Sequence, residues 1–317
     1  MNTNKDSVTP DTPKRKRRSK QNSTSEENVT SWSSFIQNSE EFEICIRLQN
    51  EIIEMINKSS LSSYCVIILI NPDCSINSFD LDQIFTALKN QNSLRERDVL
   101  LIILSDGGSI EIAYQISKLC KSFAKEKFVV AIPRQAKSAA TLIALGADEI
   151  HMSALGQLGP IDPQIGGLPA LGITQALQTI ASLSQQFPGS AEMFANYLRL
   201  ALTVAQIGYS ERICDSAVQY AERLLQTKEF LATDEIKKIA SSLVHTYKDH
   251  SFVIDLAEAK GILGNEWIKT DTPELTLAES IYQLHHSVCL NVSILKNQIL
   301  IISGDCTTTS ALIIDRT

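Results

Sequence analysis

The apolar positions of this chain follow two patterns in turn, one with helical spacing and one of short uninterrupted runs. Helical spacing is found over residues 41–57 (EFEICIRLQNEIIEMIN), 81–91 (LDQIFTALKNQ) and 108–124 (GSIEIAYQISKLCKSFA). Apolar runs of the kind found in buried strands cover residues 64–71 (YCVIILIN), 98–105 (DVLLIILS) and 127–133 (KFVVAIP). Runs without polar alternation, separated by amphipathic helices, predict an α/β fold built from βαβ units around a parallel sheet.

The pattern changes after Ile150. Residues 151–172 (HMSALGQLGPIDPQIGGLPALG) are rich in glycine and proline, and a mostly helical stretch follows from about Thr174 to Thr246. A loop of that length in a compact domain is usually functional or disordered, and its apolar content favours a functional loop. The segment 287–304 predicts a β-hairpin with its turn near Lys296 and Asn297.

The distribution of charge sets the start of the chain apart from the rest. The 317 residues are 44% hydrophobic with a net charge of -7, which excludes a protein that coats nucleic acid with its whole surface. Residues 1–30, by contrast, have almost no large apolar side chain and carry the basic block 14–18 (KRKRR), so we expect them to be disordered. The block could be a nuclear-import signal, a contact for nucleic acid or an anionic membrane, or a solubilising tail.

The lengths of the apolar runs and the spacing of the cysteines and histidines bear on where the protein is found and on whether it holds a cofactor. No apolar run is long enough to cross a bilayer and the start lacks the apolar core of a signal peptide, so we expect a cytoplasmic protein. The seven cysteines are scattered without a CxxC pair, and the five histidines show no metal spacing. Without a GxGxxG motif either, the sequence predicts no metal and no cofactor.

Ser138 stands at the head of a run of small and apolar residues, 136–150 (AKSAATLIALGADEI), just after the third predicted strand. This places its hydroxyl at a strand-to-helix turn beyond the carboxyl end of a parallel strand, where open α/β sheets bind ligands. Two interpretations are open. The serine can cap the helix that follows, or it can serve as a nucleophile.

Two neighbouring motifs bear on that choice. Gly107 and Gly108, in SDGGS, follow the second predicted strand and would present backbone N–H groups without a side chain in the way, as an oxyanion hole requires. Asp162 lies in the rigid turn LGPIDPQ. Each motif alone is commonplace, since glycine pairs and Asp-Pro turns also form ordinary turns.

In this order on successive βα units, the motifs resemble the Clp/crotonase superfamily. Within it they are most similar to the serine dehydrogenase proteinase (SDH) family, related to signal peptide peptidase A and ClpP. The resemblance spans about residues 60–265 and rests on the glycine pair, AKSAATLIALGADEIHM, LGPIDPQIGGLPA and HSFVIDLAEAKGILG. It implies a spiral of βαβ units with a mainly parallel sheet, to which the sequence pattern adds the helical segment and the C-terminal hairpin. It also implies homo-oligomers and an intracellular serine endopeptidase acting on peptides or unfolded protein, with Ser138 as nucleophile and Gly107 and Gly108 as oxyanion hole.

From these patterns and the resemblance we predict that the chain has four parts. They are a disordered basic tail (1–30), an N-terminal helix (31–59), a Clp/crotonase-like proteinase domain (60–270) and a C-terminal extension of helix and β-hairpin (271–317).

The general base departs from the pattern of the relatives. Where ClpP-like enzymes carry the triad histidine, this chain offers Asp162, and no lysine occurs between Lys137 and Lys228 to act as in signal peptide peptidase A. The stretch DHSFVIDLAEA, which resembles the region of the ClpP triad aspartate, holds His250 instead. Our hypothesis is that the partners are exchanged: His250 is the base and Asp162 orients it, because a triad is defined by roles and geometry.

Alternatives stay open for the other positions. Asp249 or Asp255 could orient the imidazole in place of Asp162, and His250 could be a solvated loop histidine. Lys137 is a poor base because adjacent side chains at a helix start diverge. We expect it to contact the substrate, as we do Gly159 and Pro160.

Two other functions also remain. A catalytically inactive Clp-fold scaffold that binds peptide or partners is favoured by the SAA at 138–140, where relatives often carry glycine. A crotonase-type enzyme acting on an acyl-CoA fits less well, because it would leave the serine without a purpose and no acid/base carboxylate pair stands out.

Overall fold

The computed structural model describes residues 32–165, 168–305 and 311–315 of the chain. The predicted disordered tail, 1–30, lies outside these residues, and so do Gly166 and Gly167 of the LGPIDPQIGGLPA motif. A short helix at 32–38 precedes the first long helix, α2 (Glu41–Lys58), which matches the helical pattern at 41–57.

A seven-stranded sheet forms the centre, in the order β11-β10-β1-β2-β3-β5-β9. Five neighbouring strands run parallel: β1 (Tyr64–Ile70), β2 (Asp98–Leu104), β3 (Phe128–Ile132), β5 (Glu149–Met152) and β9 (Ile268–Lys269). The first three are the strands that the apolar runs predicted. At the β1 edge, β10 (Gln298–Gly304) and β11 (Ala311–Asp315) add an antiparallel hairpin. The predicted fold class is confirmed.

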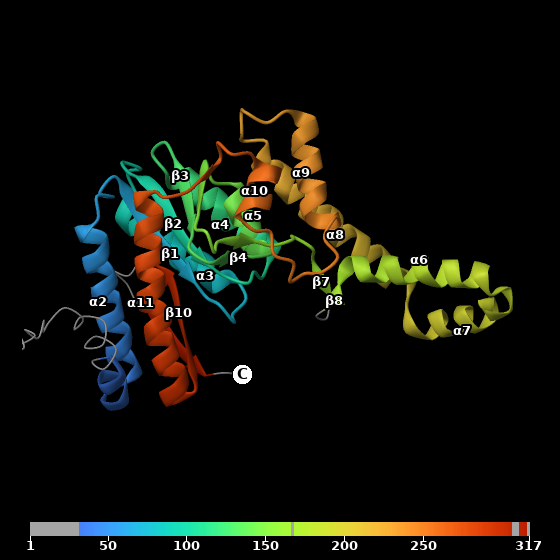
Figure 1. Cartoon of the computed structure of the whole chain (residues 1–317), viewed down its shortest axis with the longest axis horizontal. Helices are drawn as coiled ribbons and strands as arrows, with labels where there is room; N and C mark the ends of the chain where they lie inside the picture. Colours follow the sequence, from blue (N-terminus) through green and yellow to red (C-terminus); the bar gives the residue numbers. More distant parts are fainter. Residues whose placement is uncertain (1–31, 166–167, 306–310, 316–317) are drawn as a thin grey trace, which may run out of the picture.

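Helices cover both faces of this sheet (Figure 1). On one face lie α3 (Ser78–Asn92), α4 (Ile110–Phe123), α5 (Ala139–Leu145), α8 (Val204–Leu225), α9 (Thr233–His245) and α10 (Leu256–Leu263). On the other lie α2 and α11 (Pro273–Lys296). Successive residues of a strand point to opposite faces, so Ile67 and Leu69 of β1 join one core and Ile68 and Ile70 the other. An uninterrupted apolar run is what such a two-sided strand requires.

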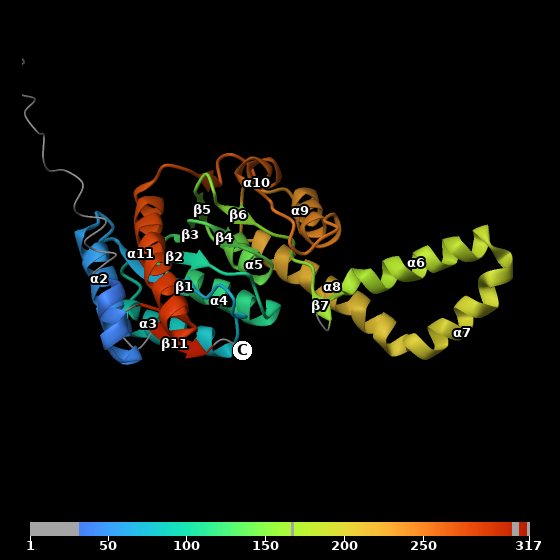
Figure 2. The same cartoon turned by 60° about the horizontal axis from the view of Figure 1, so that its bottom comes forward.

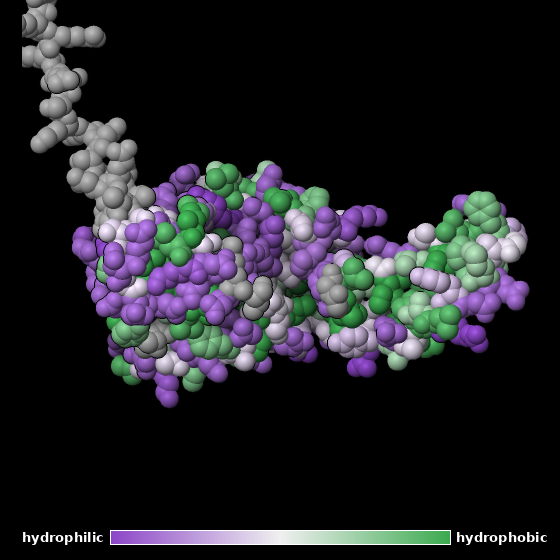
Figure 3. Space-filling view, turned by 90° about the horizontal axis from the view of Figure 1, so that it is seen from below, coloured by the Kyte–Doolittle hydropathy of each residue, from purple (hydrophilic) through white to green (hydrophobic). Residues whose placement is uncertain are grey.

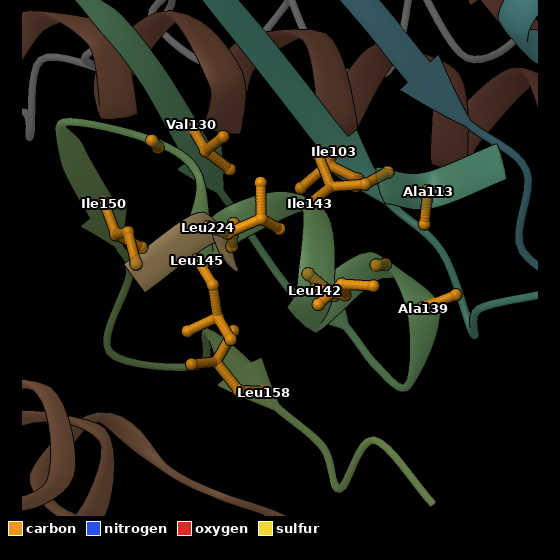
Figure 4. Packing of buried hydrophobic residues seen from close by; sticks show 14 of the residues in the cluster. Ile103, Ala113, Val130, Ala139, Leu142, Ile143, Leu145, Ile150, Leu158 and Leu224 are labelled. Carbon is orange, nitrogen blue, oxygen red and sulfur yellow. The ribbon is translucent and has the colours of Figure 1, made fainter. Parts of the chain in front are cut away.

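Helix α5 lies entirely inside the first of these cores. Its side chains Leu142, Ile143 and Leu145 pack among residues of β2, β3, β6 and α8 (Figure 4). Every residue of the helix is buried. The helix that follows Ser138 is therefore held in place by packing along its whole length.

A second, short ladder forms beyond the carboxyl ends of the parallel strands. Ser105, just after β2, bridges Ala136 of β4 (Gln135–Ala136), and β4 pairs in parallel with β6 (Gln157–Leu158). Leu158 then pairs antiparallel with Ile254. The ladder thus joins the turns that follow β2, β3 and β5 to the segment before α10.

Two helices, α6 (Ala170–Gln186) and α7 (Ala191–Ala201), form an arm that projects from the body (Figures 1 and 2). A 3-10 turn (Pro188–Ser190) joins them, and α8 leads back to the core. The small antiparallel pair β7 (Gln164–Ile165) and β8 (Leu168–Pro169) stands at the base of the arm. The arm exposes many apolar side chains, as Figure 3 shows.

The hairpin predicted over 287–304 is wrong in its first half, which is helical. Helix α11 continues to Lys296 because Val288 and Val292, one turn apart, are both buried against the sheet. Asn297 ends the helix in a left-handed conformation (φ 56°), and β10 begins at the next residue. The C-terminal hairpin is instead formed by β10 with β11. The division of the chain near residues 60 and 270 stays a prediction.

Candidate active site

Ser138 has a backbone conformation that L residues rarely adopt, with φ 52° and ψ -119°. It occupies the position before α5, but its side chain makes no capping hydrogen bond. The helix-cap interpretation is therefore wrong. Backbone strain of this kind costs about 1–3 kcal/mol and persists where the surrounding structure imposes it, often at functional sites. A strained serine on a strand-to-helix turn is the geometry of a nucleophile elbow.

Small residues make this turn possible. Ala139 and Ala140 are fully buried, and Gly107 lies directly against the serine. A Cβ at Gly107, where φ is 114°, would lie 2.7 Å from Ser138 Cβ. Only glycine fits there. This accounts for the alanines and the first glycine of the motifs.

The glycine pair is fixed by a backbone bridge to Ile76. Ile76 N–H donates to the Gly107 carbonyl at 2.8 Å, and Ser109 N–H donates to the Ile76 carbonyl at 2.9 Å. A Cβ at Gly108 would lie 2.2 Å from Ile76 N, so this position also requires glycine. The bridge leaves the Gly108 N–H on the opposite side of the strand, without a partner among the described residues.

The two predicted oxyanion donors differ in this respect. The Gly107 N–H donates to Ser105 Oγ at 3.2 Å, whereas the Gly108 N–H is free within the described part of the chain. The Ala139 N–H, at the start of α5, has no partner there either. Ala139 was not singled out from the sequence, although the residue after a nucleophile commonly supplies one oxyanion donor.

His250 and Asp162 meet through the second ladder. Leu158 and Ile254 exchange both backbone hydrogen bonds, at 2.9 and 3.0 Å. Asp162 follows Leu158 by as many residues as His250 precedes Ile254, so the antiparallel register sets the two opposite each other. The His250 Nδ1 lies 2.6 Å from Asp162 Oδ1.

This pair has the electrostatics of a base and its orienting carboxylate. The Asp162 side chain is 6% exposed and that of His250 32%. The hydrogen bond to Asp162 raises the pKa of His250 above its ordinary value of 6.5, and burial only partly opposes this. Since Nδ1 faces the carboxylate, Nε2 is the nitrogen left for a proton from a nucleophile.

The other two candidate carboxylates have other partners. Asp249 Oδ1 accepts from the Ser251 N–H at 2.8 Å, and Asp255 Oδ1 caps α10 by accepting from the Glu258 N–H at 2.9 Å. Of the three, Asp162 is the one hydrogen-bonded to the imidazole.

One cavity of about 780 Å³ brings the main predicted residues together. Ser138, both glycines, Asp162 and His250 all line it. No hydrogen bond joins Ser138 Oγ to the imidazole among the described residues. The nucleophile and base candidates thus share a cavity without a hydrogen bond between them in the described structure.

The three predicted substrate contacts lie outside this lining. Lys137 lies against Gly159, where a Cβ would come within 3.1 Å of the lysine Cβ and Cγ. Thr141 Oγ1 accepts the Gly159 N–H at 3.0 Å and donates to its carbonyl at 2.9 Å, and Pro160 is buried. In this structure these residues hold the turn before Asp162, and their contact with substrate stays a prediction.

Lys228 is separate from this site as well. Its Nζ donates to the Gly146 carbonyl at 2.9 Å, at the end of α5 opposite to Ser138. Burial lowers its pKa to about 8. It cannot reach Ser138 as a base, because the whole of α5 lies between them.

Sequence reasoning missed one wall of the cavity, which α8 provides. Its lining residues are Tyr209, Ile213, Ser216, Ala217 and Tyr220. Their spacing puts them on one face of the helix. The helical period was visible in the sequence, but only the packing of α8 beside α5 shows that this face looks into the cavity.

The mostly parallel sheet with helices on both faces (Figure 1) defines an α/β protein of the Clp/crotonase-like fold class. The chain belongs to the family of ClpP-like SDH-type serine proteinases, because the family model matches residues 42–284. The resemblance inferred from the motifs is confirmed.

Two proteins of Methanocaldococcus jannaschii are similar in sequence. The uncharacterized protein MJ0137 is 30% identical over 195 residues, 62% of this chain and 61% of the relative. The uncharacterized protein MJ1495 is 30% identical over 173 residues, 55% of this chain and 52% of the relative. The match therefore spans less than two thirds of either relative.

Solved structures with a similar fold share little sequence. A mutant of the membrane-bound stomatin-specific protease 1510-N has a TM-score of 0.42 at 16% identity, covering 68% of this chain and 83% of that one. ClpP1 from Listeria monocytogenes has a TM-score of 0.42 at 15% identity, covering 72% and 99%. At these values the likeness carries no argument about chemistry.

The residues that the structure describes contain no group of three or more His, Cys, Asp or Glu side chains placed to hold a metal ion. No helix among them is both long and apolar enough to span a bilayer.

Proposed function

We propose that this protein is a serine endopeptidase that cleaves peptides or unfolded segments through an acyl-enzyme on Ser138. The observation that carries the proposal is the strained Ser138, whose hydroxyl has no partner among the described residues and which shares a cavity with the His250–Asp162 pair. Membership of the ClpP-like serine proteinase family supports the same chemistry.

In the proposed mechanism His250 is the general base. As substrate binds, its Nε2 takes the proton from Ser138 Oγ, which attacks the scissile carbonyl carbon. Asp162 holds Nδ1–H, fixes the tautomer and stabilises the imidazolium. The imidazolium then protonates the leaving amine, and the acyl group remains on Ser138. Water, activated by the same imidazole, releases the acid and restores the enzyme.

The developing oxyanion is stabilised by backbone donors. We assign this role to the glycine pair, with the N–H of Gly108, which has no partner among the described residues, as its principal donor, together with the N–H of Ala139. Such donors act strongly because they are fixed before the reaction and point to where the charge appears. Gly107 contributes by leaving room for the serine.

We also propose that the chain forms homo-oligomers. The arm supports this, because residues 170–209 contain only two charged side chains, Glu192 and Arg199. Tyr197, Leu200 and Val204 are 66%, 85% and 87% exposed. Several large apolar side chains exposed together on one projecting element usually mark an interaction site.

A catalytically inactive, peptide-binding scaffold is the second candidate. It is favoured by the lack of a hydrogen bond between Ser138 and His250 in the described structure, although such bonds often tighten only when substrate is bound. The same cavity would bind peptide in either case.

Labelling with a fluorophosphonate probe separates the two candidates. We expect stoichiometric labelling at Ser138, lost in Ser138→Ala and reduced at least about a hundredfold in rate in His250→Ala. His245→Ala, an exposed histidine on α9, is the matched control and should label normally. An intact, folded protein that does not label would support the scaffold.

A further inference from the structure

The charged side chains around the cavity are almost all acidic. Asp73, Asp106 and Glu111 are exposed and line it on the side of the glycine pair. Asp162 is the fourth carboxylate, already paired with His250. Among the residues that the structure describes, no Lys or Arg lines this cavity.

The three outer carboxylates, which we call the acidic rim, keep their charge uncompensated. Asp106 Oδ1 accepts from the Gln135 amide at 2.6 Å, and Glu111 Oε2 accepts from the Ser109 hydroxyl at 3.0 Å. These partners are neutral. Within the described residues none of the three carboxylates forms an ion pair.

The cavity that the acidic rim lines also contains an unpartnered hydroxyl. Ser138 lines the cavity, and its hydroxyl has no hydrogen bond within the described part of the chain, so it is available to a bound ligand. A cleft lined by charges of one sign also concentrates its field and attracts ligands of the opposite charge.

The α8 wall of the cavity suits the same ligand. Tyr209 and Tyr220 on α8 line the same cavity as the rim, and Ile213 lies between them along the helix. The long aliphatic stems of Lys and Arg pack on such surfaces, and their cationic ends interact with aromatic faces.

We propose that the acidic rim makes this cavity selective for peptide segments that carry Lys or Arg beside the bond to be cleaved. This specificity rests on the proposed peptidase function, but binding through the rim does not require catalysis. The two can therefore be tested apart.

The test uses the full chain with Ser138→Ala, which binds without cleaving. Two fluorescent eight-residue peptides of Ala, Leu and Gly differ only at three positions, Lys in one and Glu in the other. We expect the Lys peptide to bind at least roughly tenfold more tightly at low salt, with the preference shrinking in about 0.5 M NaCl because salt screens exposed charges.

Neutralising the rim supplies the decisive comparison. Asp73→Asn, Asp106→Asn and Glu111→Gln together should bring the two peptides to within about twofold of each other. The matched control carries Asp82→Asn, Glu96→Gln and Glu229→Gln, exposed carboxylates away from the cavity that change the net charge equally. It should keep the preference.

The outcomes separate the two proposals. Equal binding of both peptides, no binding of either, or a preference unaffected by the rim variant would overturn the proposed selectivity. Fluorophosphonate labelling of the chain with native Ser138, measured in parallel, reports on the peptidase function. A preference for the Lys peptide without fluorophosphonate labelling would contradict the proposed peptidase function and support the proposed selectivity.

Discussion

His250 Nδ1 lies 2.6 Å from Asp162 Oδ1, although the two residues are 88 positions apart in the chain. Their meeting follows from one antiparallel bridge, in which Leu158 and Ile254 exchange backbone hydrogen bonds and so fix the register between the two segments. The motif that resembles the histidine region of ClpP-like relatives carries the aspartate here, and the motif of the aspartate carries the histidine. The hydrogen bond agrees with exchanged partners.

The pH dependence of activity should report this bond. The hydrogen bond to Asp162 raises the pKa of His250 above 6.5, and only the neutral imidazole can act as a base. We therefore expect kcat/KM to rise with pH along a limb whose midpoint lies above 6.5, and Asp162→Asn to move this midpoint to lower pH while lowering the rate. A peptide-hydrolysis profile of both proteins measures it. If the midpoint stays in place in Asp162→Asn, the assignment of the orienting residue fails.

The raised pKa of His250 also makes the stability of the fold depend on pH. Because the folded-state pKa of His250 is raised, its bond to Asp162 stabilises the fold fully below pH 6.5 and loses this contribution as pH rises through the raised value. Wild type and His250→Gln should therefore differ most in free energy of unfolding on the acid side. Urea unfolding at several pH values provides the check.

Substitutions at Ser138 should separate strain from capping. With φ 52° and ψ -119°, Ser138→Gly relieves strain, and we expect it to be more stable than wild type by about 1 kcal/mol after the entropy cost of glycine. Ser138→Ala keeps the Cβ and should stay within about 0.5 kcal/mol of wild type. Denaturant unfolding of the three proteins gives the comparison. A loss of about 1 kcal/mol in Ser138→Ala would instead indicate a capping role.

The arm should control assembly. Leu200→Glu with Val204→Glu places charges on side chains that are 85% and 87% exposed in a single chain, so the folded monomer should tolerate them. In an oligomer that buries this surface, unpaired charges are costly, and we expect dissociation. Light scattering after size-exclusion chromatography measures the mass. Leu94→Glu, at a residue 78% exposed outside the arm, is the control and should leave the mass unchanged.

Lys228 should make stability depend on pH in the alkaline range. Burial lowers its pKa from 10.5 to about 8, so between these values the unfolded chain binds a proton that the folded chain does not. Stability therefore gains from this group as pH rises from 8 to 10.5. We expect the Tm of wild type to rise over this range, relative to Lys228→Met, by on the order of a few degrees. Parallel melting curves that keep a constant difference would contradict the shifted pKa.

Local sequence patterns predicted the first three strands of the central sheet correctly and failed clearly at one segment. The runs at 64–71, 98–105 and 127–133 became β1, β2 and β3, because a strand buried on both faces must be apolar throughout. The segment 287–304 has similar composition, yet its first half is helical. A short apolar run fits a buried helix as well as a strand, and tertiary packing decides between them.

The sequence by itself determined the residues that need a special local backbone: Ser138 between its strand and helix, the glycine pair, and the turn that holds Asp162. These are short-range requirements, visible as residue types at fixed positions. Only the tertiary structure decided what meets across the cavity. The bond between His250 and Asp162 and the α8 wall of the cavity depend on strand register and on helix packing. Both arise from contacts between segments far apart in the chain, which no local pattern encodes.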